Sequence, residues 1–288
     1  MNRKLIVAAF CLAAAFACKK KEETPAPAPA PAATPVAATT ETQPPAKSAT
    51  PQATVTLAAG APIPGSGVAL WLQADDAKPG EKVVSWTNPQ VAGVTATAAA
   101  AEEQPMVVAN ALNGHSVVRF DGEQNMLMTN IDISPAGMPE ATIFAVFVSR
   151  TEGTPPLRKL YGDDNGSYDR AAGLDNRAEG KNYTLFTGKD VAGDFRLEKE
   201  KPYLTTDQFA AKDVSTWVNG HATLTKVETD YGEALPNMYI GGTGTSYHEL
   251  WQGDIAEMIV YGRVLSDQER TQVEDYLAKK YGMAVTRP

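Results

Sequence analysis

The segment between Tyr161 and Arg177 holds the densest group of side chains able to bind an ion or a polar ligand. It contains carboxylates and amides separated by glycines, and carboxylate oxygens are ligands that calcium takes. The spacing does not match an EF-hand loop, in which glycine stands sixth. The same residue types are typical of turns, where Asp and Asn bond their own backbone. We expect turns and no obligatory cofactor, with calcium as the open alternative. The candidate calcium ligands are Asp163, Asp164 and Asp169.

Two groups of aromatic and planar polar side chains are suited to contact with a sugar or a protein. One group lies in the same acidic segment, and the other precedes the last predicted strand. Trp251 also fits a role as a largely buried residue that caps the edge of the domain, because tryptophan is usually well buried. The candidate ligand-binding residues are Tyr168, Arg170, Arg177, Tyr247, His248 and Trp251.

Sequence patterns of hydrolytic enzymes do not occur in the chain. Gly-x-Ser-x-Gly is absent, and Gln252 stands where the zinc motif that His248 would begin needs its second histidine. Retaining glycosidases need two carboxyl groups about 5–5.5 Å apart. Asp254 and Glu257 are three positions apart, so they are expected on opposite faces of a strand. We therefore expect that the chain is not an enzyme.

The chain has a formal net charge of −8, from 26 basic and 34 acidic residues. Nucleic-acid binding needs a basic face, so this balance argues against a nucleic-acid partner.

The N-terminus has the pattern of a secretory signal: a basic start, an apolar run from Leu5 to Phe16 and small residues before Cys18. The run is shorter than the roughly 20 residues that a membrane-spanning helix needs. The stretch from Ala15 to Cys18 resembles a bacterial lipobox, in which the cysteine becomes lipidated. Lys19 then implies, by resemblance to Gram-negative lipoproteins, the outer membrane. Residues 1–17 are predicted to be the signal peptide and Cys18 the site of lipid attachment.

Composition divides the rest of the chain in two. Residues 18–66 are rich in Pro and Ala and lack aromatic residues, which predicts a disordered tether that favours polyproline II. Residues 67–288 carry short β-branched and aromatic runs every 8–12 residues, separated by turn residues, which predicts an all-β sandwich. The pair Asn219–Gly220 predicts a tight hairpin. No disulfide is expected, because Cys11 and Cys18 are the two cysteines.

The last strand is predicted from Asp254 to Tyr261, and both of its faces are largely apolar. Ser266 followed by Glu269 forms the pattern of a capping box, which begins a helix. Gly282 is placed to end that helix. We expect the helix to pack on the sandwich.

Five stretches resemble bacterial laminin-G-like, concanavalin A-like domains: Val68–Ala74, Val84–Trp86, Leu112–Gly122, Met238–Gly242 and Gly253–Ser266. The resemblance implies an all-β, two-sheet antiparallel jelly roll with one C-terminal helix. It also implies a mostly non-catalytic module that binds glycans or proteins in cell envelopes, in some members with calcium.

The sequence thus predicts an outer-membrane lipoprotein, facing the periplasm or the exterior, whose sandwich loops bind a glycan or an envelope protein, as in recognition or cell adhesion. Two alternatives remain: a polysaccharide-acting enzyme of the same fold, and a structural spacer in the envelope.

The lipid anchor is testable by one substitution. Cys18→Ala removes the sulfur atom to which the lipid would be attached. The chain should then be lost from the membrane fraction, because no acyl chain holds it there. Cys11→Ala is the matched control and should fractionate like the unaltered chain. Equal membrane association of the two variants would disprove lipidation at Cys18.

Overall fold

The computed structural model describes residues 52–151, 157–163, 170–175, 182–188, 190–229, 236–244 and 249–287. All of them belong to one structural unit that includes Ala46–Pro288. Among these described residues, no helix is both long and apolar enough to cross a membrane.

Nine strands form the first sheet, sheet A, in the order β1-β2-β17-β8-β13-β14-β15, and β6 pairs with both β17 and β5. The last strand in the sequence therefore lies in the middle of the sheet, between β2 and β8. The strands of sheet A are β1 (Val55–Thr56), β2 (Ser66–Gln73), β5 (Met106–Leu112), β6 (His115–Asp121), β8 (Ala141–Ser149), β13 (Pro202–Phe209), β14 (Asp213–Val218), β15 (His221–Glu228) and β17 (Gln252–Tyr261).

Eight strands form the second sheet, sheet B, in the order β12-β11-β10-β9-β16-β7-β4-β3. The strands of sheet B are β3 (Ser85–Thr87), β4 (Thr95–Thr97), β7 (Leu127–Thr129), β9 (Arg158–Gly162), β10 (Ala171–Leu174), β11 (Asn182–Phe186), β12 (Asp190–Arg196) and β16 (Tyr239–Ile240). All strand pairs in both sheets are antiparallel. The predicted two-sheet, all-β sandwich of jelly-roll type is confirmed.

The main core lies between the sheets and is filled by alternate residues of each strand. Sheet A contributes side chains such as Leu70 and Phe147, and sheet B contributes Leu160 and Leu185, all of them fully buried. The predicted hairpin is also present: β14 and β15 meet at Asn219 and Gly220, which both adopt positive φ angles of 50° and 77°.

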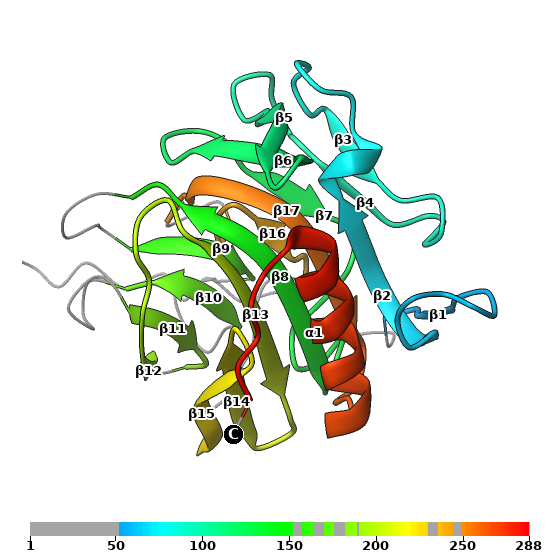
Figure 1. Ribbon diagram of the computed structural model, residues 1–288, viewed down its shortest axis with the longest axis vertical. Helices are drawn as coiled ribbons and strands as arrows, with labels where there is room; N and C mark the ends of the chain where they lie inside the picture. Colours follow the sequence, from blue (N-terminus) through cyan, green and yellow to red (C-terminus); the bar gives the residue numbers. More distant parts are fainter. Residues whose placement is uncertain are drawn as a thin grey trace, which may run out of the picture. The chain divides into compact units, whose positions relative to one another are not determined.

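A short 3-10 helix (Ala74–Asp76) follows β2, and the single described α-helix, α1 (Asp267–Tyr281), lies along the outer face of sheet A (Figure 1). Ser266 and Glu269 form the predicted capping box, and Gly282 ends the helix in the left-handed conformation. The buried side of α1, which includes Val273 and Leu277, packs on a second apolar cluster on this face.

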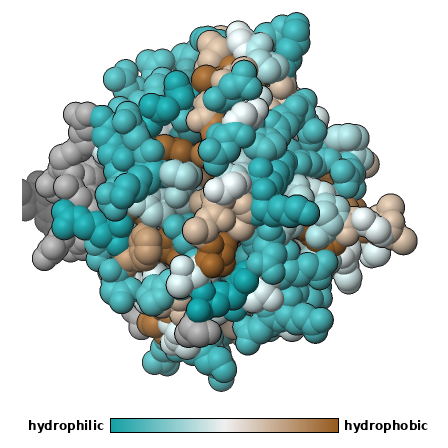
Figure 2. Space-filling view, in the orientation of Figure 1, coloured by the Kyte–Doolittle hydropathy of each residue, from teal (hydrophilic) through white to brown (hydrophobic). Residues whose placement is uncertain are grey.

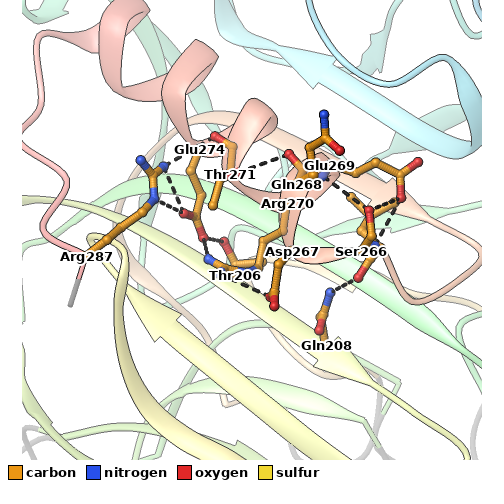
Figure 3. Close-up of polar contacts among 11 residues, drawn as sticks. Thr206, Gln208, Ser266, Asp267, Gln268, Glu269, Arg270, Thr271, Glu274 and Arg287 are labelled. Carbon is orange, nitrogen blue, oxygen red and sulfur yellow. Dashed lines mark hydrogen bonds and ion pairs between the residues drawn. The ribbon is translucent and has the colours of Figure 1, made fainter.

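Polar contacts fix α1 to the sheet as well (Figure 3). The buried Glu274 carboxylate accepts hydrogen bonds from Thr206 of β13 at 3.0 Å, from Arg270 at 2.6 Å and from Arg287 at 3.2 Å. Gln208 donates to the main-chain oxygen of Leu265 at 2.9 Å. The helix is therefore held by β13 on one side and by the C-terminal segment on the other.

The packed domain begins before the predicted start at residue 67. Val55 and Thr56 form β1 and pair with β2, and the side chains of Leu57 and Ile63 are buried. The domain therefore includes residues that the composition alone assigns to the tether.

A buried carboxylate joins the two sheets through the core. Asp207 of β13 accepts hydrogen bonds from the hydroxyls of Tyr161 at 2.8 Å and Tyr183 at 2.6 Å, which belong to sheet B, and from Thr216 at 2.9 Å. Burial raises the pKa of Asp207 to about 6, although these hydrogen bonds act in the opposite direction.

This network predicts a specific pH dependence. A carboxyl group whose pKa rises on folding contributes stability that is complete below its unfolded pKa, about 3.8, and is lost as the pH rises through about 6. Asp207→Asn removes this contribution. Compared with the variant, the unaltered chain should therefore lose on the order of 1–3 kcal/mol of unfolding free energy between pH 4 and pH 8.

Urea unfolding across this pH range measures the effect. The exposed Asp194 of β12 supplies the control, and Asp194→Asn should leave the profile unchanged. Parallel profiles for the unaltered chain and Asp207→Asn would contradict the assignment.

Candidate functional site

The sequence-predicted site residues divide between described and undescribed parts of the chain. Asp163, Arg170 and Trp251 are described. The remaining predicted residues lie outside the described residues: Cys18, Asp164, Tyr168, Asp169, Arg177, Tyr247 and His248.

Trp251 is part of the core and is not available as a stacking platform. Its side chain is fully buried and meets the Phe147 ring edge-on, with 5.4 Å between centroids. Trp251 precedes β17, and alternation along the strand turns it to the same side as Gly253 and Ile255, which face the other sheet. The prediction that Trp251 contacts a ligand is corrected accordingly.

Arg170 is also buried, and its guanidinium holds main-chain oxygens. It donates to Ile133 at 3.0 Å and to Pro139 at 2.9 Å, and it lies 5.3 Å from the Phe209 ring centroid. Arg170 therefore anchors the segment before β8 and does not present its charge to a ligand, which corrects its predicted role.

Asp163 accepts a hydrogen bond from the main-chain N–H of Arg170 at 2.7 Å. It is fully buried, and burial raises the pKa of its carboxyl group to about 7. Within the described ranges, no group of three or more His, Cys, Asp or Glu residues could hold a metal ion. Since Asp164 and Asp169 lie outside those ranges, the calcium site stays a prediction.

The two carboxylates of β17 lie on the same face of the strand, so the prediction of opposite faces is wrong. A register shift between Ile255 and Glu257 inserts one residue, which keeps Asp254 and Glu257 on the outer face of sheet A. Asp254 accepts hydrogen bonds from Arg119 at 2.6 Å and from Arg150 at 3.0 Å.

Glu257 accepts hydrogen bonds from the Trp71 indole at 2.6 Å and from Lys280 at 2.7 Å. Each of the two carboxylates is thus engaged by several donors. The arrangement suits structural anchors better than an acid and a nucleophile, which need a free position for substrate.

The helix α1 covers the central strands of sheet A, which are β2, β17, β8 and β13, so the outer face of sheet B is the better candidate surface. In the view of Figure 2, the surface over α1 is mainly hydrophilic, with apolar residues in small patches. Strand register defines one row across sheet B from β3 to β11, on the side turned away from the core. The row is Ser85, Thr97, Met128, Tyr239, Gly162, Ala171 and Phe186.

The part of this face on β3, β4 and β7, here termed the open half, is accessible. Its outward residues are Ser85, Thr87, Thr95, Thr97 and Met128, while Trp86, Ala96 and Leu127 between them are buried in the core. Met128 is 39% exposed. The open half therefore presents hydroxyls, methyl groups and a thioether, and none of its five side chains is charged.

The other part, on β16, β9, β10 and β11, is the covered half. Thr243 lies over Gly162, where an added Cβ would come within 3.0 Å of the threonine methyl carbon. Lys159 is 1% exposed, and its amine lies 3.5 Å from the Asp175 carboxylate and 5.9 Å from the Phe186 ring centroid. The cation on this half is thus neutralised by a buried carboxylate.

Comparison with known proteins supports the fold. No family model matches the chain, and no curated protein matches it in sequence. Among solved structures, a sialidase from Trypanosoma rangeli in complex with the inhibitor DANA is similar, with 18% identity and a TM-score of 0.53 over 74% of this chain. This chain spans about a third of that sialidase, 33% of its length.

Two further structures have the same fold. One is domain 4 of an extracellular arabinanase from Geobacillus stearothermophilus, in complex with arabinotriose, with 13% identity and a TM-score of 0.52 over 72% of this chain and 97% of that domain. The other is the binding domain of botulinum neurotoxin serotype D, with 12% identity and a TM-score of 0.51, covering 73% of this chain and 52% of the other. The resemblance to laminin-G-like domains is thus supported at the level of a β-sandwich.

These structures contradict the expectation that the chain is not an enzyme. Two of the three come from enzymes, a sialidase and an arabinanase. The fold therefore gives no ground for excluding catalysis, and missing sequence motifs were an insufficient reason to do so.

The buried position of Trp251 gives a stability prediction. Trp251→Ala should lower the unfolding free energy by about 3–5 kcal/mol, because it opens a cavity beside Phe147. Met128→Ala, at an exposed position, should change it by about 0.5 kcal/mol or less. Denaturant unfolding measures both free energies. A Trp251→Ala variant as stable as Met128→Ala would contradict the buried position of Trp251.

Proposed function

We propose that this domain recognises a glycan on the open half of sheet B, as part of a protein that works in carbohydrate processing. The observation that carries the proposal is an exposed sheet face lined by Ser85, Thr87, Thr95, Thr97 and Met128. Hydroxyl groups both donate and accept hydrogen bonds, as sugar hydroxyls do. The Met128 side chain offers an adaptable apolar contact for the C–H face of a sugar ring.

The sheet also gives the surface a fixed geometry. The cross-strand pairs Ser85–Thr97 and Thr87–Thr95 place hydroxyls on two neighbouring strands, and neighbouring strands lie about 4.8 Å apart. The inward residues Trp86 and Ala96 are packed in the core, which fixes the backbone of these strands. The strands therefore lose little conformational entropy when a ligand binds. Three adjacent strands span roughly 10 Å, which suits a short run of sugar rings.

The similar structures are consistent with this proposal. The arabinanase domain matches over nearly its whole length and holds arabinotriose, and the sialidase holds an inhibitor. We further propose that an acyl anchor on Cys18 and the Pro/Ala-rich tether place the domain at the outer membrane, as the sequence predicts.

Binding of the purified full chain to a glycan array tests the proposal. Thr87→Arg places a long cation on the open half and should weaken binding about tenfold or more, equivalent to about 1.4 kcal/mol. Thr225→Arg is the matched control, since Thr225 is an exposed strand residue of sheet A. Binding lost equally in both variants, or retained in both, would contradict the site.

The enzyme alternative is tested on the same samples. The array glycans that bind are incubated with the full chain, and new reducing ends are measured. Cleavage that disappears in Thr87→Arg and persists in Thr225→Arg would show that the open half holds a substrate.

A further inference from the structure

The open half is uncharged although the chain as a whole is rich in charge. Charged residues make up 21% of the sequence, yet the five outward side chains of β3, β4 and β7 include none. By contrast, β12 at the far edge of the same sheet exposes Asp194 and Arg196. An anionic ligand on the open half would lose hydration without gaining an opposite charge from these five residues, and that exchange is unfavourable.

The Glu103 carboxylate near the border of the open half also disfavours an anion. Tyr239 borders it in the same register row, and burial, with a smaller contribution from the nearby Glu103 carboxylate, raises the pKa of the Tyr239 phenol. The Glu103 charge would therefore repel an anion bound at this border. On the covered half, Lys159 is buried and lies 3.5 Å from Asp175, so its charge is already balanced. The net charge of −8 adds a general repulsion of polyanions.

We infer that the glycan recognised by the open half is neutral, and that uronate, sulfate and sialic acid groups are excluded from it. This inference rests on the proposed function and narrows its ligand class. Selection works by hydroxyl and C–H contacts from Ser85, Thr97 and Met128, and by the absence of a compensating cation among the open-half residues.

An isosteric pair of variants tests the inference. Thr87→Gln and Thr87→Glu have nearly the same shape and differ in charge. For a neutral ligand both variants should weaken binding to the same extent, within about twofold. The longer side chain obstructs the ligand equally in both, and its charge has no partner on a neutral ligand. Calorimetry on the full chain uses arabinotriose and other neutral oligosaccharides from the array as probes, with uronate-, sulfate- and sialic acid-bearing oligosaccharides for comparison.

The expected result is binding of neutral probes that is insensitive to ionic strength up to about 0.15 M, with acidic probes at least tenfold weaker. The inference is overturned if an acidic probe binds best and Thr87→Glu is about tenfold weaker than Thr87→Gln toward it. If both variants bind every probe as tightly as the unaltered chain, the proposed site itself is wrong, and the inference fails with it.

Discussion

The Glu257 carboxylate is the contact on which the arrangement of the domain most depends. Besides Trp71 of β2, it receives hydrogen bonds from three residues of α1: Tyr276 at 3.2 Å, Lys280 at 2.7 Å and Tyr281 at 2.9 Å. Because a buried carboxylate that loses its partners is costly, these donors must stay in place. The central strand β17 thus fixes α1 over sheet A, which leaves the outer face of sheet B as the surface for recognition.

The two faces of the sandwich differ in kind as a result. The centre of sheet A is covered by apolar side chains of α1, while the open half of sheet B carries hydroxyls and Met128. Asp207 couples the sheets across the core through Tyr161 and Tyr183. A sandwich with α1 packed over the centre of sheet A and an accessible open half on sheet B suits recognition of an extended ligand by preformed geometry.

Strong local signals predicted the C-terminal part of the fold. The capping box at Ser266 and the stop at Gly282 are set by backbone chemistry within a few residues, so sequence alone suffices. The open half was missed because β4 and β7 have three residues each, too few to show alternation, and their pairing is set by distant strands. The sequence predicted Asp254 and Glu257 on opposite faces of β17, but the bulge between Ile255 and Glu257 places them on the same face. One inserted residue exchanges the faces of all residues that follow it.

The central claim is that a glycan covers the open half, and radical footprinting of the full chain tests it most directly. Met128 and Met106 are similarly exposed, 39% and 38%, and lie on different sheets, so they form an internal pair for oxidation to sulfoxide. With a saturating neutral oligosaccharide, oxidation of Met128 should fall several-fold while that of Met106 stays constant. Unchanged oxidation of Met128 under saturation, or protection of Met106 instead, would contradict the account.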